Sequence, residues 1–82
     1  MTELLGLPTE VRLGPGGAVQ AVRLPEGWRV VERTTARWRV ETDWWREPVR
    51  RDYHRCVTRT GECVEVYRDL GTDAWHLARR YD

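Results

Sequence analysis

The sequence predicts a mainly β protein, a small antiparallel barrel or strongly bent sheet of about six to seven short strands. Apolar and polar residues alternate with a period of two in several segments, and clusters of glycine and proline separate these segments. No long segment shows a helical pattern. The 82 residues suffice for one domain with one core. Because the chain has five tryptophans and no phenylalanine, a few large rings must fill that core.

The first residues differ from the rest of the chain. Residues 1–8 contain one apolar run that is too short to form a helix alone, and we expect a flexible N-terminal arm or a cover for the edge of the sheet there. The alternating pattern starts at Thr9. Residues 9–82 are therefore predicted to form a single all-β domain.

A hairpin is predicted at the start of this domain. Val11 and Leu13 would share one face of its first strand, and residues 18–24 would form its second strand. Between them, residues 14–17 read Gly-Pro-Gly-Gly, a strong turn signal.

Two further extended segments follow. Residues 28–32 come after a break at residues 25–27, and Trp28 and Val30 are expected to share a buried face. Residues 36–42 show the clearest alternation of the chain. One face of this strand would carry Ala36, Trp38 and Val40.

A central hairpin is predicted after a corner at Pro48. Its strands would cover residues 49–59 and 62–68, with Thr60 and Gly61 as a two-residue turn. Residues 74–81 fit either a final strand or a short helix.

The cysteines and histidines raise the question of a metal site. With the two-residue turn, Thr58 lies opposite Cys63, so Cys56 and Cys63 fall diagonally on one face. His54 and His76 would complete a set of four zinc ligands, but the spacing matches no compact zinc knuckle. Both thiols are expected to be reduced in the cytoplasm, since no signal peptide or membrane-spanning run is visible. We predict no metal and no cofactor.

The residues of a catalytic centre are sparse. The chain has no serine, and although His54 and Cys56 can be neighbours on a strand face, no glycine-rich oxyanion or phosphate loop accompanies them. We therefore expect no enzyme activity and no small-molecule substrate.

The charge distribution favours an anionic partner instead. All fourteen basic residues are arginine, and residues 29–59 hold nine of them against five acids. Residues 44–55 interleave three aromatic rings with four arginines, and guanidinium groups bind phosphates while aromatic rings stack on bases. The alternative is a mixed, solvated surface in which arginines pair with nearby acids. The predicted binding residues are Trp44, Trp45, Arg46, Arg50, Arg51, Tyr53, Arg55 and Arg68.

The tryptophans are expected to divide between core and surface. We expect Trp28, Trp38 and Trp75 to be buried. Trp44 and Trp45 are adjacent, so in an extended chain they point in opposite directions and one of them should be partly exposed.

A family resemblance rests on an ordered set of short motifs. The chain resembles a small domain of unknown function that is similar to the C-terminal module of ImuB-type proteins, which are catalytically inactive relatives of Y-family DNA polymerases. The resemblance spans roughly residues 10–80, and His54 and Cys56 depart from the family pattern. The motifs are Arg37-Trp38-Arg39-Val40, Trp44-Trp45-Arg46, Pro48-Val49-Arg50-Arg51 with Tyr53 and Arg55, Val66-Tyr67-Arg68-Asp69-Leu70, and Trp75.

This resemblance implies a context more than an activity. ImuB-type proteins are adaptors in damage-induced mutagenesis that join an error-prone polymerase to the sliding clamp. The chain has neither a polymerase motif nor an evident clamp-binding peptide. We therefore expect a non-enzymatic adaptor of DNA repair or translesion synthesis that contacts single-stranded or duplex DNA. The alternative is a protein-only adaptor that binds a repair or polymerase protein, because Trp, Tyr and Arg are also enriched in protein interfaces.

Overall fold

A computed structural model describes residues 2–42 and 48–81, and confirms a mainly β fold. The described residues form one sheet of seven strands with a short 3₁₀ turn, η1 (Pro15–Gly17). The strands are β1 (Thr2–Thr9), β2 (Val11–Leu13), β3 (Val19–Leu24), β4 (Gly27–Thr42), β5 (Val49–Thr58), β6 (Cys63–Asp69) and β7 (Trp75–Tyr81).

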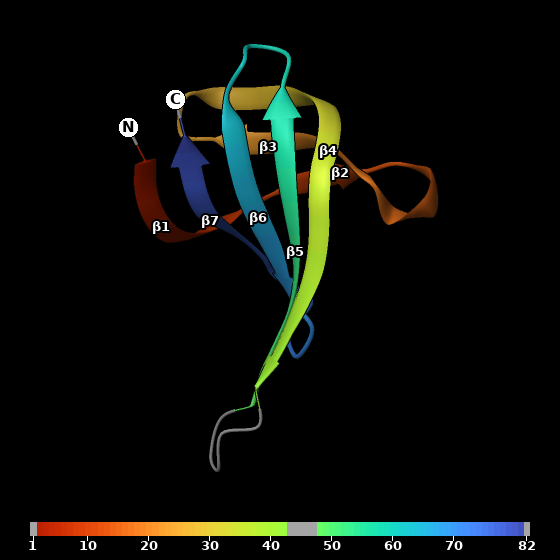
Figure 1. Cartoon of the computed structure of the whole chain (residues 1–82). Coiled ribbons are helices and arrows are strands. Elements are labelled where there is room, and N and C mark those ends of the chain that lie inside the picture. The colour runs from red at the N-terminus through yellow and green to blue at the C-terminus, as the bar shows by residue number, and fades with distance from the viewer. Residues whose placement is uncertain (1, 43–47, 82) are drawn as a thin grey trace.

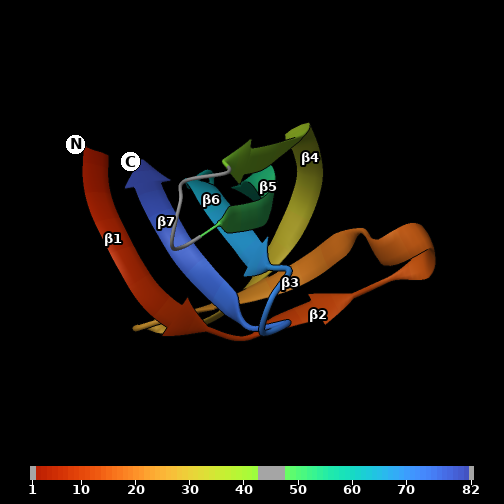
Figure 2. The same ribbon diagram turned by 90° about the horizontal axis from the view of Figure 1, so that it is seen from below.

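The strands form an antiparallel meander that curls into a half-barrel (Figures 1 and 2). Their order is β1-β7-β6-β5-β4-β3-β2, so the first strand pairs with the last. Only Glu10 separates β1 from β2, although these two strands lie at opposite edges of the sheet. Near this connection the hydroxyl of Thr9, the last residue of β1, donates a hydrogen bond to the carbonyl of Arg23 in β3, and this bond links β1 to the other end of the sheet.

Strand β4 is long enough to belong to two layers of the half-barrel. Its first residues, 27–30, pair with β3, whereas residues 31–42 pair with β5. The register of the pairing between β4 and β5 shifts twice where β4 passes from one layer to the other, between Val31 and Arg33 and between Thr34 and Ala36. Such bulges bend a strand. The two segments that the sequence predicted around residues 33–35 are therefore one continuous, bent strand.

The core lies between these layers. One layer holds β2, β3 and the start of β4, and the other holds β1, β7, β6, β5 and the rest of β4 (Figure 2). The buried apolar residues are Val19, Val22, Leu24, Cys56, Val64, Val66 and Leu77, and Val11, Val31 and Trp75 pack against them. The second face of the larger layer is concave and turned away from β2 and β3; we call it the hollow face (Figure 2).

The predicted burial of the tryptophans is wrong for Trp28. Trp28 and Val30 are 37% and 47% exposed, because they lie on the outer face of the smaller layer. The guanidinium of Arg12 lies 4.8 Å from the centre of the Trp28 ring. Trp38 and Trp75 are half-buried rather than fully buried.

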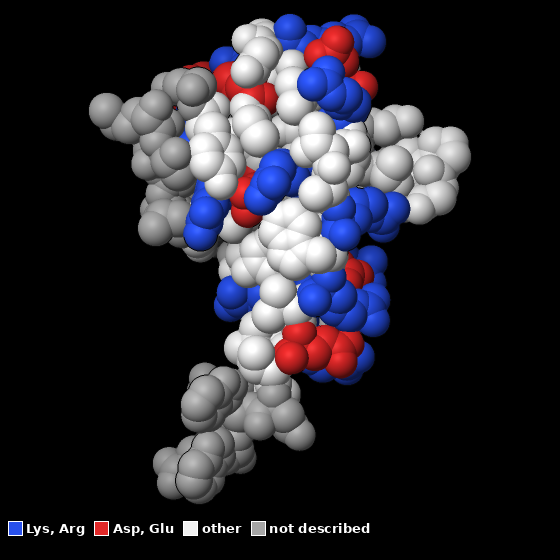
Figure 3. All heavy atoms as spheres, in the orientation of Figure 1, with Lys and Arg blue, Asp and Glu red and all other residues white. Residues whose placement is uncertain are grey.

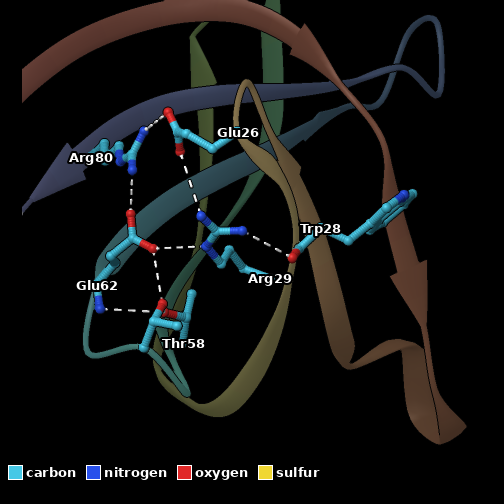
Figure 4. A network of polar contacts seen from close by, with 7 residues as sticks. Glu26, Trp28, Arg29, Thr58, Glu62 and Arg80 are labelled. Carbon is cyan, nitrogen blue, oxygen red and sulfur yellow. Dashed lines mark hydrogen bonds and ion pairs between the residues drawn. The ribbon is translucent and has the colours of Figure 1, made fainter.

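A polar network occupies the inward position that Trp28 was expected to take (Figure 4). Glu62, on the β5–β6 loop, accepts hydrogen bonds from Arg80 of β7 and, at 3.2 Å, from Arg29 of β4. Arg80 also donates to Glu26 at 2.7 Å. Burial favours a higher pKa for Glu62, but hydrogen bonds from Thr60, Arg80 and Arg29 outweigh it and hold the pKa below 4.5. The network thus joins three separate parts of the fold.

The central hairpin is confirmed, but its register differs by one residue from the prediction. The backbone N–H of Thr58 donates to the carbonyl of Glu62 at 2.8 Å, and the backbone N–H of Gly61 donates to the carbonyl of Thr58 at 3.0 Å. Gly61 has a φ of 88°. This is a three-residue loop with a glycine bulge, so Cys63 pairs with Val57.

The shift moves side chains from one face to the other. Cys56 is now opposite Val64 and buried in the core, whereas Cys63 belongs to the hollow face. The expected diagonal placement of the two thiols on one face is therefore wrong. Both cysteines are free.

The two ends of the chain are both strands. Thr2–Thr9 pairs with β7, so this segment covers that edge of the sheet and is not a loose arm. Pro8, which interrupted the sequence pattern, is tolerated because β1 is an edge strand and one row of its N–H groups needs no partner. The undecided segment at residues 74–81 contains β7. Among the described residues, no helix is long and apolar enough to cross a membrane.

Candidate functional site

A row of four aromatic side chains crosses the hollow face. It consists of Trp38, Tyr53, Tyr67 and His76, one from each of β4, β5, β6 and β7. The rings of Trp38 and Tyr53 are stacked with centroids 5.2 Å apart, and those of Tyr67 and His76 are stacked at 4.9 Å. Tyr53 and Tyr67 are 5.1 Å apart and tilted.

The sheet register produces this row. Trp38 pairs with Tyr53, Tyr53 with Tyr67, and Tyr67 with His76, so each ring lies directly opposite the next. Directly opposite residues in antiparallel strands have Cβ atoms about 4.5–5.5 Å apart, which brings their rings into contact. The row is therefore a continuous set of contacting rings that spans four strands.

Arginines cover parts of this row. The guanidinium of Arg51 lies 4.4 Å from the centre of the Tyr67 ring and donates to the Tyr53 hydroxyl at 3.3 Å. This hydrogen bond to Tyr53 raises the pKa of Arg51. Arg55 lies 5.4 Å from the Trp38 ring. Planar guanidinium groups are suited to such stacking.

One buried carboxylate balances part of the positive charge. Glu65 is 4% exposed, and it accepts hydrogen bonds from Arg55 at 3.2 Å and from the Tyr81 hydroxyl at 2.8 Å. Arg79 donates to the same Tyr81 hydroxyl at 3.4 Å, and this bond raises the pKa of Arg79. Within residues 6–42 and 48–81, neither Arg51 nor Arg79 forms an ion pair with a carboxylate.

These side chains surround a hollow of about 520 Å³. Its volume falls within the range of about 300–1,000 Å³ that is common for ligand sites. Figure 3 shows this face, on which arginine side chains lie among and beside uncharged surface. The hollow is lined by Gly6, Trp38, Val40, Arg51, Tyr53, Glu65, Tyr67, Ala78 and Arg79.

The rings differ in how much surface they offer to a ligand. Tyr67 is only 7% exposed, and Arg51, Tyr53 and His76 all lie against its ring. Tyr67 therefore serves as the floor of the hollow. Tyr53 and Trp38 are half-buried and retain accessible ring surface.

The structure brings together some of the predicted binding residues and separates others. Arg51, Tyr53 and Arg55 share the hollow face with this row. Arg50 and Arg68 do not, because successive residues of a strand point to opposite faces, and they leave the sheet on the core side. The structure therefore does not bring them together with Arg51, Tyr53 and Arg55. Trp44, Trp45 and Arg46 lie outside the described residues.

Sequence reasoning missed several members of the site. Tyr67, His76 and Arg79 join it through the pairing of β6 with β5 and β7. Trp38 was expected in the core, although the alternation of β4 does place it with Ala36 and Val40. The local pattern gives the face of each residue within its strand, but only the register between strands shows which residues meet.

The histidines and cysteines do not converge. His54 and Cys56 point into the core, whereas His76 and Cys63 lie on the hollow face. In the part of the chain that is described, no three His, Cys, Asp or Glu side chains are grouped to hold a metal ion. Burial raises the pKa of the Cys56 thiol, and burial together with nearby Arg37 lowers the pKa of His54.

Comparisons with known proteins give no match: no family model, curated protein or solved structure is similar to this chain.

Proposed function

We propose that this protein is a non-enzymatic binding domain that contacts single-stranded nucleic acid through its hollow face. One observation carries the proposal: Arg51 and Arg79, which form no ion pair with a described carboxylate, line a hollow with an aromatic floor. A guanidinium group binds phosphate oxygens through two parallel hydrogen bonds. The two arginines are thus suited to two phosphates of one strand.

The accessible rings suit the bases of the same strand. Bases in a duplex are stacked on one another, so only an unpaired strand can place a base against a protein ring. Trp38 and Tyr53 offer such rings beside the two arginines. Each stacked base contributes about 1–3 kcal/mol by alanine substitution.

The biological setting rests on the sequence resemblance to ImuB-type proteins. In that setting the domain acts as an adaptor in DNA repair or translesion synthesis, and it positions a DNA strand or a polymerase without carrying out chemistry.

The test is a titration of a labelled single-stranded oligonucleotide at low and moderate salt. Arg51→Ala and Arg79→Ala should each weaken binding and lower the slope of log affinity against log salt by about 0.7, the value for one phosphate contact with a single strand. Arg50→Ala is the matched control, since Arg50 is the neighbour of Arg51 in β5 but points to the other face. Equal losses in the Arg50 and Arg51 variants would contradict a site in the hollow.

A protein partner is the second candidate, because a different observation favours it. The rings are largely stacked on one another and on arginines, which gives a rigid surface rich in Trp, Tyr and Arg. Such surfaces are frequent at the energetic centres of protein interfaces. If the oligonucleotide does not bind even at low salt, this candidate replaces the first.

A further inference from the structure

Strand β4 has one edge that no described strand covers. Strand β3 pairs only with residues 27–30 of β4, while β5 pairs with the opposite edge of β4 from Val31 to Thr42. From Arg33 to Thr42, β4 therefore presents a row of backbone N–H and C=O groups to which no described strand is hydrogen-bonded. The pairing with β5 runs without a register shift from Ala36 to Thr42, so this edge is regular. Regular free edges can accept another strand.

The two sides of this edge differ in chemistry. Ala36, Trp38 and Val40 are half-buried toward the hollow face, and side chains on the same face of an added strand would pack against them. On the other side Arg37 and Arg39 are exposed. Arg39 makes two hydrogen bonds to Asp52, at 2.7 and 3.1 Å, whereas Arg37 forms no ion pair within the described part of the chain.

These arginines disfavour pairing between two copies of the protein. In a symmetric antiparallel pair centred on Arg37 or on Arg39, each of these residues faces its own copy. In a pair centred on Trp38, Arg37 faces Arg39. Like charges directly opposite one another are destabilising. Registers centred on Arg37, Trp38 or Arg39 are therefore unfavourable for a second copy, whereas a strand of opposite charge complements this part of the edge.

We propose that the β4 edge from Arg33 to Thr42 binds an extended acidic segment of a partner protein by strand addition. Backbone hydrogen bonds supply the affinity and the alternating side chains supply the specificity. Acidic residues of the segment lie beside Arg37, and apolar residues alternate with them and cover Trp38 and Val40. This edge shares Trp38 and Val40 with the hollow, but its backbone groups and Arg37 are separate from the proposed phosphate contacts at Arg51 and Arg79.

The test uses synthetic peptides of about eight residues, a common strand length, in which Glu and Val alternate. Binding is followed by hydrogen exchange of the protein's backbone amides. The expected result is new protection of alternate amides between Arg33 and Thr42. A peptide concentration of about 1 mM detects complexes with a binding free energy of roughly −4 kcal/mol. The absence of protection at this concentration would overturn the proposal.

Backbone pairing is tested by N-methylation of the peptide at every second residue. One of the two possible sets of methyl groups faces the protein and should abolish binding, while the other faces solvent and should leave it intact. If both methylated peptides bind like the parent, strand addition is wrong. A peptide in which Lys replaces Glu should not bind.

The charge requirement is tested by Arg37→Glu, which should weaken binding of the Glu-Val peptide by about tenfold or more. Arg23→Glu is the matched control, since Arg23 is an exposed strand arginine of the other layer and the change in charge is the same. An equal loss of peptide affinity in the two variants would show that the effect comes from net charge alone, and it would overturn the assignment to this edge. Arg79→Ala should weaken binding of the oligonucleotide and leave binding of the peptide unaffected, because Arg79 lies on β7, away from the β4 edge, so the two proposals fail separately.

Discussion

The rings of Trp38 and Tyr53 lie within 5° of parallel, with their centroids 5.2 Å apart, and they join strand β4 to its neighbour β5. Both residues lie on the hollow face, outside the buried core cluster. The stack thus stabilises a second packed region on the opposite side of the sheet.

A double-mutant cycle on Trp38→Ala and Tyr53→Ala should measure this contact. The coupling free energy is expected to be about 0.5–1.5 kcal/mol, typical for aromatic pairs, as determined from urea unfolding. A cycle that combines Trp38→Ala with Tyr81→Ala is the control, because no aromatic contact joins these two rings in the described structure. If both cycles gave the same coupling, the stack would have no special role.

Folding stability should depend on the protonation of His54. The side chain is buried, its ring contacts Trp75, and its Nδ1 has no hydrogen-bond partner among the described residues. Burial and Arg37 lower the pKa of His54 below 6.5 in the folded state, so the unfolded chain binds a proton more readily. Protonation of His54 should therefore not lower the free energy of unfolding above pH 6.5. Below that value the free energy of unfolding should fall as the pH drops.

Denaturant midpoints between about pH 5 and pH 8 measure this effect, since a histidine titrates there. His54→Leu should flatten the pH dependence of the denaturant midpoint. His76→Asn leaves His54 in place and should retain this pH dependence. An unchanged dependence in His54→Leu would assign the effect to other groups.

The polar network of Figure 4 should respond strongly to the loss of one charge. The side chain of Glu62 is 14% exposed and bonds to both Arg29 and Arg80. Glu62→Gln leaves these arginines without their shared carboxylate and should destabilise the fold by about 1–3 kcal/mol in urea unfolding. Glu32→Gln removes an exposed carboxylate paired with Arg33 and should cost less than about 1 kcal/mol. Similar losses in both variants would show that burial of the network is unimportant.

The two cysteines should react at different rates with a thiol reagent. Cys63 is half-buried on the hollow face, whereas Cys56 is completely buried and its thiol pKa is raised by burial. Cys63 should be labelled in the native protein and Cys56 only after unfolding. Because the two side chains lie on opposite faces, mild oxidation should yield no bond between them. Rapid labelling of both thiols, resolved by mass spectrometry of single-cysteine variants, would contradict this placement.

Much of the fold follows from local patterns. The glycine-rich turn at residues 14–17 and the hairpin around Gly61 are both present, because they depend on conformations that glycine adopts readily. The exact loop size at Gly61 could not be predicted, since a two-residue and a three-residue loop both accept a glycine there. That single residue reversed the predicted faces of Cys56 and Cys63 relative to each other.

The candidate site was predictable only in part. Arg51, Tyr53 and Arg55 alternate within one strand, so their common face follows from the sequence once the strand is known. Tyr67 and His76 reach this face through pairing between strands, and local alternation contains no information about that register. Trp28 was assigned to the wrong face because alternation does not show which of two faces is buried.

The pairing of β1 with β7 has a consequence for how the protein is made. During synthesis β1 emerges before the other six strands of this sheet and β7 after them, so β1 must wait for the strand with which it pairs until the rest of the sheet has been translated. Contacts between such distant segments slow folding. The sheet is therefore completed as a late event, and until β7 is in place β1 is open to unwanted pairing.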